Sequence, residues 1–266
     1  MPIKEKARKL LDEGLDGVLG YRVVDGTHVP HLFSPEDIDR MSEDYPGDER
    51  YPVSLLLRRL QAENPGVRLG VVVRGCDERA LIELAKQGQV DLDRIVMLGL
   101  ACDEDLVCSC GCPQPYPSGI EQGEKVAAVP AEKLIEKLDS LRPDERLAYW
   151  RGQFGACIKC YGCRNVCPMC YCKECALEDE DLVERGVVPP GEPVFHLIRA
   201  LDMAGRCIDC GLCEEACPMG IPLRTLYRKV GLCVEEKLGY RPGRSVEEEC
   251  PLAILGTDTD IGGPGD

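Results

Sequence analysis

The sequence predicts an α/β domain with a partly parallel sheet, followed by a mainly helical domain. Two apolar runs, Val67–Val73 and Ile95–Leu98, have the pattern of buried parallel strands, and a helical pattern that begins at Asp77 lies between them. In the second half, the frame C-x2-C-x2-C-x3-C-P occurs twice, at 157–168 and at 207–218. This frame is the ligand run of proteins that hold two iron–sulfur clusters, so two copies predict two 4Fe–4S clusters.

The N-terminal part alternates between helical and extended patterns. Apolar residues at helical spacing predict a helix over 3–13, and the apolar run 17–24 predicts a strand that ends at the Asp25-Gly26 turn. Residues 29–33 are expected to pair back on that strand. Two more helices are expected, one that begins at Ser34-Pro35-Glu36-Asp37 and one over 53–63.

The strand–helix–strand unit places two cysteines at one edge of the sheet. Its helix is expected to begin at a cap formed by Asp77 and to end near Gly88. Cys76 follows the first strand and Cys102 follows the second. Because the carboxyl ends of parallel strands meet at one edge, both thiols are expected where open α/β sheets bind ligands.

A linking region follows the second strand. Residues 108–119 are rich in Cys and Pro and are expected to form a loop that is neither helix nor strand. A strand at 125–129 and a helix at 131–141, begun by Pro130, are expected next. We place the domain boundary at Arg142-Pro143, which predicts an α/β domain over 1–142, a helical domain over 143–245 and a disordered tail over 246–266.

The helical prediction for the second domain comes from its apolar spacing. Val194, Leu197, Ile198 and Leu201 form one face of a helix that leads into the second cysteine motif. Pro222 is suited to open a further helix. This domain is therefore predicted to be a helical, ferredoxin-like module with two clusters.

The spacing of the motifs predicts which cysteines share a cluster. Three closely spaced thiolates surround one cluster, and the fourth, which precedes proline, turns to the other cluster. One cluster is therefore assigned to Cys157, Cys160, Cys163 and Cys217, and the other to Cys207, Cys210, Cys213 and Cys167. The alternative is zinc, but a four-cysteine zinc site favours paired C-x2-C knuckles rather than this frame.

Eight further cysteines suggest additional sites. Clustered soft thiolates suit a third cluster, with the ligands Cys170, Cys172 and Cys175, although no fourth ligand lies nearby in sequence. A fourth cluster is expected in the N-terminal domain, held by members of the set Cys76, Cys102, Cys108, Cys110 and Cys112. Cys110 or Cys112 is the candidate to complete the third cluster. The alternatives are reduced thiols at the third set, and a flavin near Gly75, Cys76 and Asp77 with structural cysteines around it.

The remaining cysteines and the histidines suggest no further site. Cys233 and Cys250 stand alone and are expected to be inert thiols. His28 and His31 are distant in sequence from His196, which we interpret as structural or facing solvent.

Composition narrows the class of protein. Eighteen cysteines in 266 residues, without a signal peptide or an apolar run long enough to cross a bilayer, predict a reduced cytoplasmic protein whose cysteines bind metal. A net charge of −15 argues against a nucleic-acid partner, because phosphate binding needs a basic surface. The acidic surface suits docking onto a basic patch of a protein partner, and the alternative is a merely solvated surface.

Two segments resemble known families. Val71-Val-Val-Arg-Gly-Cys76 and Ile95-Val-Met-Leu-Gly-Leu-Ala-Cys102 look like the beta subunits of coenzyme F-420-reducing hydrogenases and formate dehydrogenases. That family usually has Val-Gly-x-Pro-Cys-Gln at the first segment, whereas Arg74-Gly75 replaces the Gly-x-Pro part here. Members of that family bind FAD and at least one 4Fe–4S cluster, and they exchange electrons with the deazaflavin coenzyme F-420. The resemblance therefore implies that Cys76 and Cys102 are cluster ligands. The second half resembles the helical ferredoxin domains of heterodisulfide reductase C and fumarate reductase iron–sulfur subunits.

Together these observations predict an iron–sulfur electron-transfer subunit of an anaerobic, hetero-oligomeric oxidoreductase. The partners would be redox subunits of a hydrogenase, a formate dehydrogenase or a heterodisulfide-reductase-like complex, and the chain itself would not be catalytic. The alternative is a flavin-bearing subunit that exchanges hydride with coenzyme F-420 or NAD and feeds electrons to the clusters. A third hypothesis is a protein whose metal sites only stabilise its fold.

Overall fold

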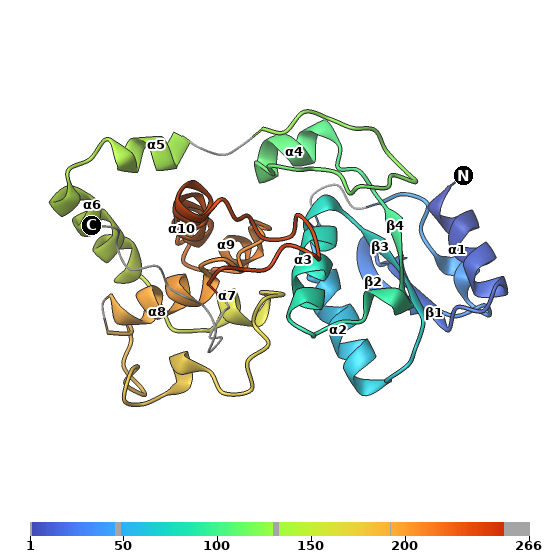
Figure 1. Cartoon of the computed structure of the whole chain (residues 1–266), viewed down its shortest axis with the longest axis horizontal. Helices are drawn as coiled ribbons and strands as arrows, with labels where there is room; N and C mark the ends of the chain where they lie inside the picture. The colour runs from blue at the N-terminus through green and yellow to red at the C-terminus, as the bar shows by residue number, and fades with distance from the viewer. Residues whose placement is uncertain (1, 46–48, 130–132, 192, 253–266) are drawn as a thin grey trace.

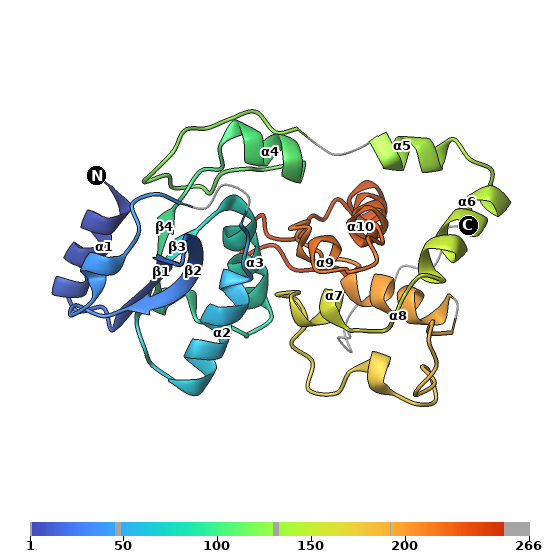
Figure 2. The ribbon, with the colours of Figure 1, turned by 180° about the vertical axis from the view of Figure 1, so that it is seen from behind.

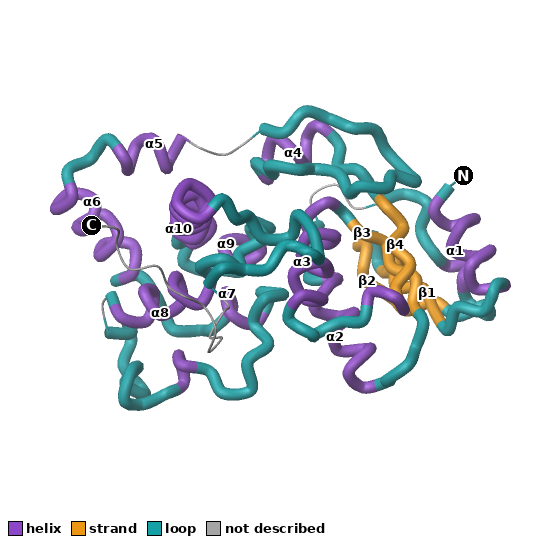
Figure 3. Tube along the Cα trace, viewed as in Figure 1, coloured by secondary structure: helices purple, strands orange, loops and turns teal. Residues whose placement is uncertain are grey.

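The computed structural model describes residues 2–45, 49–129, 133–191 and 193–252. An α/β part formed by the first half of the chain lies beside a helical part formed by the second half (Figure 1). All strands of the described residues belong to the first part, as the colouring in Figure 3 shows. The predicted fold class, a partly parallel α/β domain followed by a helical dicluster region, is therefore confirmed.

The sheet has four strands in the order β2-β1-β3-β4. An antiparallel hairpin joins β1 (Gly17–Val24) to β2 (Thr27–Phe33), as expected from the Asp25-Gly26 turn. The other two strands, β3 (Leu69–Val73) and β4 (Ile95–Gly99), are parallel to each other, and β3 is also parallel to β1. This pairing confirms the predicted strand–helix–strand unit.

Helices cover both faces of the sheet. On one side lies α1 (Ile3–Asp12), and on the other lie α2 (Val53–Glu63) and α3 (Gly75–Lys86), as Figures 1 and 2 show. Helical spacing places Ile3, Ala7 and Leu11 on the buried face of α1. These side chains join the strands in one hydrophobic core. α3 begins at Gly75, two residues before the predicted cap, and the Asp77 carboxylate accepts a hydrogen bond from the backbone N–H of Arg74 over 3.0 Å.

The second half consists of short helices joined by loops. Their bounds are α5 (Lys133–Asp139), α6 (Pro143–Phe154), α7 (Gly162–Asn165), α8 (Val194–Met203), α9 (Leu212–Glu215) and α10 (Leu223–Leu238). The predicted helices at Val194–Leu201 and after Pro222 correspond to α8 and α10. Phe154, Met203 and Tyr227 form a core in this half, and Ala80 and Leu84 of α3 are part of the same core. The two halves therefore share a packed interface along α3.

Two local predictions differ from the structure, and two concern residues that lie at least partly outside its described ranges. Residues 108–119 are not wholly a loop, because α4 (Glu104–Cys110) contains Cys108 and Cys110. The Asp103 carboxylate caps this helix by accepting from the N–H of Leu106 over 2.8 Å, and Gly111 ends it at φ 60°. No strand forms within 125–129; instead Gln122 makes an isolated bridge with Leu100. Pro130 and residues 253–266 of the tail lie outside the described residues.

The helix expected at Ser34–Asp37 is also wrong. The Asp37 carboxylate accepts hydrogen bonds from the Ser34 N–H over 2.7 Å and from the His31 ring over 2.8 Å. These local side-chain bonds compete with helical ones, so the segment forms only a 3₁₀ turn over Ile38–Arg40. Further 3₁₀ turns span Leu92–Arg94 and Ala176–Glu178.

Candidate iron–sulfur centres

The first predicted set of four cysteines lines one cavity. It lies where the loop that follows α6 meets the end of the second motif, and its cysteines are Cys157, Cys160, Cys163 and Cys217. Three of them come from the first motif and one from the second, as the sequence predicted. The crossing is possible because the short helices α7 and α9, each embedded in one motif, contact each other.

The second set shows the reciprocal arrangement. A neighbouring cavity is lined by Cys207, Cys210 and Cys213 of the second motif and by Cys167 of the first. The two motifs also share an unusual backbone. Lys159 and Asp209, at equivalent positions, both have φ near 55°, and Tyr161 and Gly211 also have positive φ. Left-handed residues at matching positions give both loops the same path around their cavities.

The burial of these thiols suits a metal cluster. Burial raises the pKa of Cys210 to about 12, and it raises the pKa of Cys207 and Cys213 as well. Such thiols do not ionise near neutral pH unless a cation compensates for the lost solvation. Iron supplies that charge, since it binds the thiolate form. The donor set therefore fits 4Fe–4S clusters.

A single metal ion fits these sites less well. Within the described part of the chain, no three His, Cys, Asp or Glu side chains are grouped as ligands of one ion. A cubane cluster is different because each thiolate binds a separate iron, so its ligands are spread around a larger body.

A third cavity in the N-terminal half is lined by four cysteines from three places in the chain. Cys76 lies in the first turn of α3, Cys102 follows β4, and Cys110 and Cys112 lie at and just after the end of α4. Burial raises the pKa of Cys102 to about 12. Cys108 does not line this cavity, and its side chain is exposed. Of the five N-terminal candidates, the structure therefore brings four together.

Arginine side chains join this N-terminal cavity to the second motif. Arg50 donates from Nη1 to Cys110 Sγ over 3.2 Å and to the carbonyl oxygen of Cys210 over 2.6 Å. Arg79 lies within 3.6 Å of Cys112 Sγ and donates from Nε to the carbonyl oxygen of Ile208 over 3.2 Å. A small cavity between the two sites is lined by both Cys76 and Cys210. The N-terminal thiols and the Cys207–Cys213 loop are thus neighbours.

A third arginine reinforces this junction. Arg224 of α10 donates to the carbonyl oxygens of Cys110, Gly111 and Asp209, and its Nε forms an ion pair with the Asp209 carboxylate at 2.6 Å. These arginines were not identified from the sequence, because, apart from the contacts within the 209–224 segment, each contact joins residues between 33 and 160 positions apart. No local motif could have indicated them.

The third predicted set, Cys170, Cys172 and Cys175, lines a separate cavity of about 360 Å³. Neither Cys110 nor Cys112 lines this cavity; both line the N-terminal one. Cys170 also lies beside Cys167: a hydrogen bond between the two side chains lowers the pKa of Cys167 and raises that of Cys170. The set therefore lies next to the dicluster but outside its two cavities.

The residues proposed for a flavin are covered by protein. A Cβ atom added to Gly75 would lie 2.4 Å from the carbonyl oxygen of Gln114 and 2.6 Å from that of Tyr116. The loop after α4 therefore packs directly on the start of α3. A flavin placed against Gly75, Cys76 and Asp77 would have to displace this loop, so these residues do not fit the cofactor in this conformation.

His196 is buried rather than facing solvent. It is 3% exposed and stacks on Phe154, with ring centroids 4.2 Å apart. Burial lowers the pKa of His196 to about 4. The neutral imidazole lines the first cavity as part of its apolar wall.

Comparison with known proteins agrees with this geometry. Residues 156–222 match the family model described as a 4Fe-4S dicluster domain. The chain is 40% identical over 133 residues to the F420-dependent formate dehydrogenase subunit beta of Methanocaldococcus jannaschii. This match covers 49% of this chain and 35% of the relative. It is also 40% identical over 146 residues to the F420-dependent formate dehydrogenase 1 subunit beta of Methanococcus maripaludis. That match covers 54% of this chain and 37% of the relative.

The matches span only 35% and 37% of the length of these relatives. Among the helices of the described residues, none is long and apolar enough to cross a membrane. The helical half of this chain therefore contains a 4Fe–4S dicluster domain, and about half of the chain is similar to the beta subunits of F420-dependent formate dehydrogenases.

Proposed function

We propose that this chain is an iron–sulfur electron-transfer subunit of a multi-subunit oxidoreductase. The observation that carries the proposal is the crossed arrangement of two cysteine sets in the dicluster domain, with a further four-cysteine cavity beside the second set. Similarity to beta subunits of formate dehydrogenases supports the same class of protein. Bound 4Fe–4S clusters would accept and release single electrons.

The cysteines have defined roles in this proposal. Cys157, Cys160, Cys163 and Cys217 hold one cluster, and Cys207, Cys210, Cys213 and Cys167 hold the second. We propose that Cys76, Cys102, Cys110 and Cys112 hold a further cluster in the N-terminal half. The buried thiols exclude water from the metal, and the cavity walls set how exposed each site is, which is one of the factors that determine a cluster's potential.

Arginines at the junction stabilise added negative charge. The guanidinium groups of Arg50, Arg79 and Arg224 contact residues of the N-terminal set, and each also contacts the 208–210 segment of the second motif. A fixed cation near a thiolate favours the more reduced form of the site. These groups also hold the two sites in register, because each donates hydrogen bonds to both sides; Arg50 reaches the Cys110 sulfur on the N-terminal side, whereas Arg79 and Arg224 reach backbone carbonyls there.

We propose that the partner is another redox subunit of a cytoplasmic hetero-oligomer. The net charge of −15 favours a partner with a basic docking patch. We also propose that the chain divides into an α/β domain over 1–142, a helical domain over 143–245 and a tail over 246–266, and that the first two domains are packed together at their boundary. Before that boundary, α5 is tied to the helical half by an ion pair between Asp139 and Lys229 at 2.6 Å. A cut at 142 would therefore sever a helix from its packing partner.

A second candidate function is a flavin-bearing subunit that exchanges hydride with F420 or NAD. The names of the relatives, which are F420-dependent, favour it. The loop that covers Gly75 argues against a flavin at the residues first considered.

Native mass spectrometry and a redox titration of the anaerobically purified full chain test the proposal. We expect a holo-mass that accounts for several 4Fe–4S clusters without flavin, and electron paramagnetic resonance signals that appear and disappear reversibly with potential. A chain without iron, or clusters whose oxidation state never changes, would overturn electron transfer. A mass that includes one flavin would favour the second candidate instead.

A further inference from the structure

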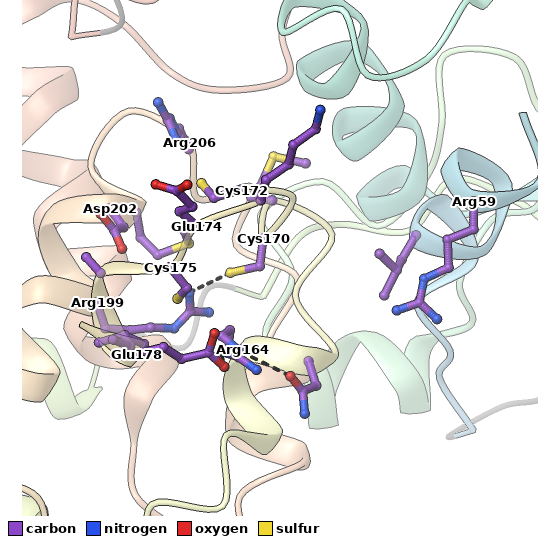
Figure 4. Close-up of a pocket in the computed structure, with 17 residues that line it drawn as sticks. Arg59, Arg164, Cys170, Cys172, Glu174, Cys175, Glu178, Arg199, Asp202 and Arg206 are labelled. Carbon is purple, nitrogen blue, oxygen red and sulfur yellow. Dashed lines mark hydrogen bonds and ion pairs between the residues drawn. The ribbon is translucent and has the colours of Figure 1, made fainter. Parts of the chain in front are cut away.

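One cavity of the described residues contains three cysteines that the two motif cavities do not use. Cys170, Cys172 and Cys175 lie on one side of this cavity, and Arg59 of α2 lies on the other side (Figure 4). Its volume is about 360 Å³, and Cys172 is exposed. These thiols line neither of the two dicluster cavities. Their spacing, C-x-C-x2-C, brings three soft ligands to one short loop.

A buried cation contacts this set. Arg199 is only 1% exposed, and its Nη1 lies 2.7 Å from Cys170 Sγ, the contact drawn as a dashed line in Figure 4. From Nη2, Arg199 also donates a hydrogen bond to the carbonyl oxygen of Cys163 over 2.9 Å. Within the described residues, its polar contacts therefore include a sulfur and a carbonyl rather than a carboxylate. A buried guanidinium needs polar partners close by, and the Cys170 sulfur is one of them.

A second arginine contacts the same set. Arg164 lines the cavity and forms an ion pair with Glu178 at 2.5 Å. Burial acts to lower the pKa of Arg164, but hydrogen bonds with Glu178 and Cys175 raise it overall. One guanidinium therefore lies beside Cys170 and another beside Cys175, where they would offset the negative charge that thiolate ligands bring to a cluster.

We propose that Cys170, Cys172 and Cys175 bind three irons of a further 4Fe–4S cluster, and that its fourth iron has no cysteine ligand and faces the open cavity. No other cysteine lines this cavity among the described residues. The fourth iron would take an oxygen ligand, from solvent or from a cavity carboxylate such as Asp202. This inference is independent of the proposed electron transfer, because it concerns only iron content and iron exchange.

The iron without a thiolate would be the one that is most easily lost. Oxidation of this cluster by one electron, with ferricyanide as the acceptor, would convert [4Fe–4S]²⁺ to [3Fe–4S]⁺ and release Fe²⁺. The electron passes to ferricyanide, which becomes ferrocyanide, so charge and iron both balance. Added Fe²⁺ and a one-electron reductant would reverse the step. Clusters with four cysteine ligands hold each iron by a thiolate and should resist this loss.

The first test compares the full chain with the double variant Cys172→Ser/Cys175→Ser. The matched control is Cys233→Ser, since Cys233 is an exposed cysteine outside every cavity described above. After anaerobic purification, we expect the double variant to lose one cluster's worth of iron and sulfide, while the control keeps the wild-type content. Equal iron and sulfide in all three proteins would overturn the proposal. Reversible redox signals from the remaining clusters in the double variant would separate this result from the proposed function.

Two further measurements start from the wild-type chain, and the first needs no variant. In the first, the anaerobic holoprotein is alkylated with iodoacetamide and its peptides are mapped by mass spectrometry. We expect Cys233 to be modified and Cys172 to be protected until the clusters are removed by acid and a chelator. Modification of exposed Cys172 in the holoprotein would overturn the proposal, because a free thiol there is open to the reagent.

The second measurement follows oxidation with ferricyanide by electron paramagnetic resonance. We expect a 3Fe–4S signal that grows with oxidation, disappears after Fe²⁺ and reductant are added, and is absent from Cys172→Ser/Cys175→Ser. No such signal in the wild type, or an equal signal in the double variant, would contradict an incompletely ligated cluster at this site.

Discussion

Arg50 donates a hydrogen bond from Nη1 to the carbonyl oxygen of Cys210 over 2.6 Å, across 160 positions of the chain. The same nitrogen lies 3.2 Å from Cys110 Sγ, and Nη2 forms an ion pair with Glu215. One guanidinium therefore contacts the N-terminal thiol site and the dicluster domain together. A substitution of Arg50 therefore tests the electrostatic link between the N-terminal site and the dicluster domain directly.

Arg50→Gln should lower the midpoint potential of the N-terminal cluster by tens of millivolts. Removal of a nearby cation destabilises the state that carries the extra electron. A redox titration followed by electron paramagnetic resonance measures the shift. Arg8→Gln is the control, because Arg8 forms an exposed ion pair with Asp39. An unchanged or raised potential in Arg50→Gln would argue against this electrostatic role.

Cys110→Ala and Cys108→Ala test the N-terminal ligand set with two changes in one helix. Cys110 lines the N-terminal cavity, whereas the exposed Cys108 does not. We expect Cys110→Ala to lose one cluster's worth of iron and Cys108→Ala to keep the full content. Anaerobic iron and sulfide analysis decides the point, and equal losses in the two variants would show that the assignment is wrong.

Gly75→Ala should lower the occupancy of the same N-terminal site. An added Cβ would lie 2.4 Å from the carbonyl oxygen of Gln114, so the loop that follows Cys112 must move. Ligands that are displaced from their geometry bind a metal less well. The control is Gly152→Ala in α6, where a Cβ meets nothing within 4 Å. Normal iron content and a normal spectrum in Gly75→Ala would show that the loop adapts without disturbing the site.

Cys163→Ala should lose one cluster of the dicluster pair and destabilise the helical half. The reason is that cluster binding is coupled to folding where the ligands come from distant segments. Iron analysis and circular dichroism measure the two effects, and Cys233→Ala controls for the loss of a thiol. Wild-type iron content together with wild-type stability in Cys163→Ala would overturn its assignment as a ligand.

Tyr240→Phe should weaken the contact between the two halves of the chain. The Tyr240 hydroxyl lies 3.0 Å from an oxygen of the Glu83 carboxylate, to which it donates, and Glu83 is fully buried. The same carboxylate forms an ion pair with Lys86 at 2.9 Å. Loss of one donor to a buried charge should reduce the free energy of unfolding by about 1–3 kcal/mol. Urea unfolding of the holoprotein measures this, with Tyr149→Phe as the control, and equal midpoints would refute it.

The sequence predicted those features that depend on local spacing. The two cysteine frames predicted two crossed sets of four, because the distance between ligands along a short loop limits what they can surround, and each set lines one cavity. The apolar runs Val67–Val73 and Ile95–Leu98 predicted parallel strands, because continuous apolar runs are typical of strands buried on both faces of a sheet, and the structure has these strands at Leu69–Val73 and Ile95–Gly99. The sequence also indicated that Cys76 and Cys102 would meet at one edge of that sheet, and both line the N-terminal cavity.

The tertiary structure decided what depends on contacts between distant segments. Cys110 and Cys112 join Cys76 and Cys102 at one cavity, whereas the Cys108 side chain is exposed. Asp103 caps the start of α4, and residues two apart on a helix, such as Cys108 and Cys110, point to different sides of it. The side chains of Arg50 and Arg199 find their sulfur contacts in segments 60 and 29 positions away, respectively. Cysteine spacing is encoded locally and can be read from the chain, but the burial of a cation beside a thiol depends on tertiary packing between segments that are separated in the sequence.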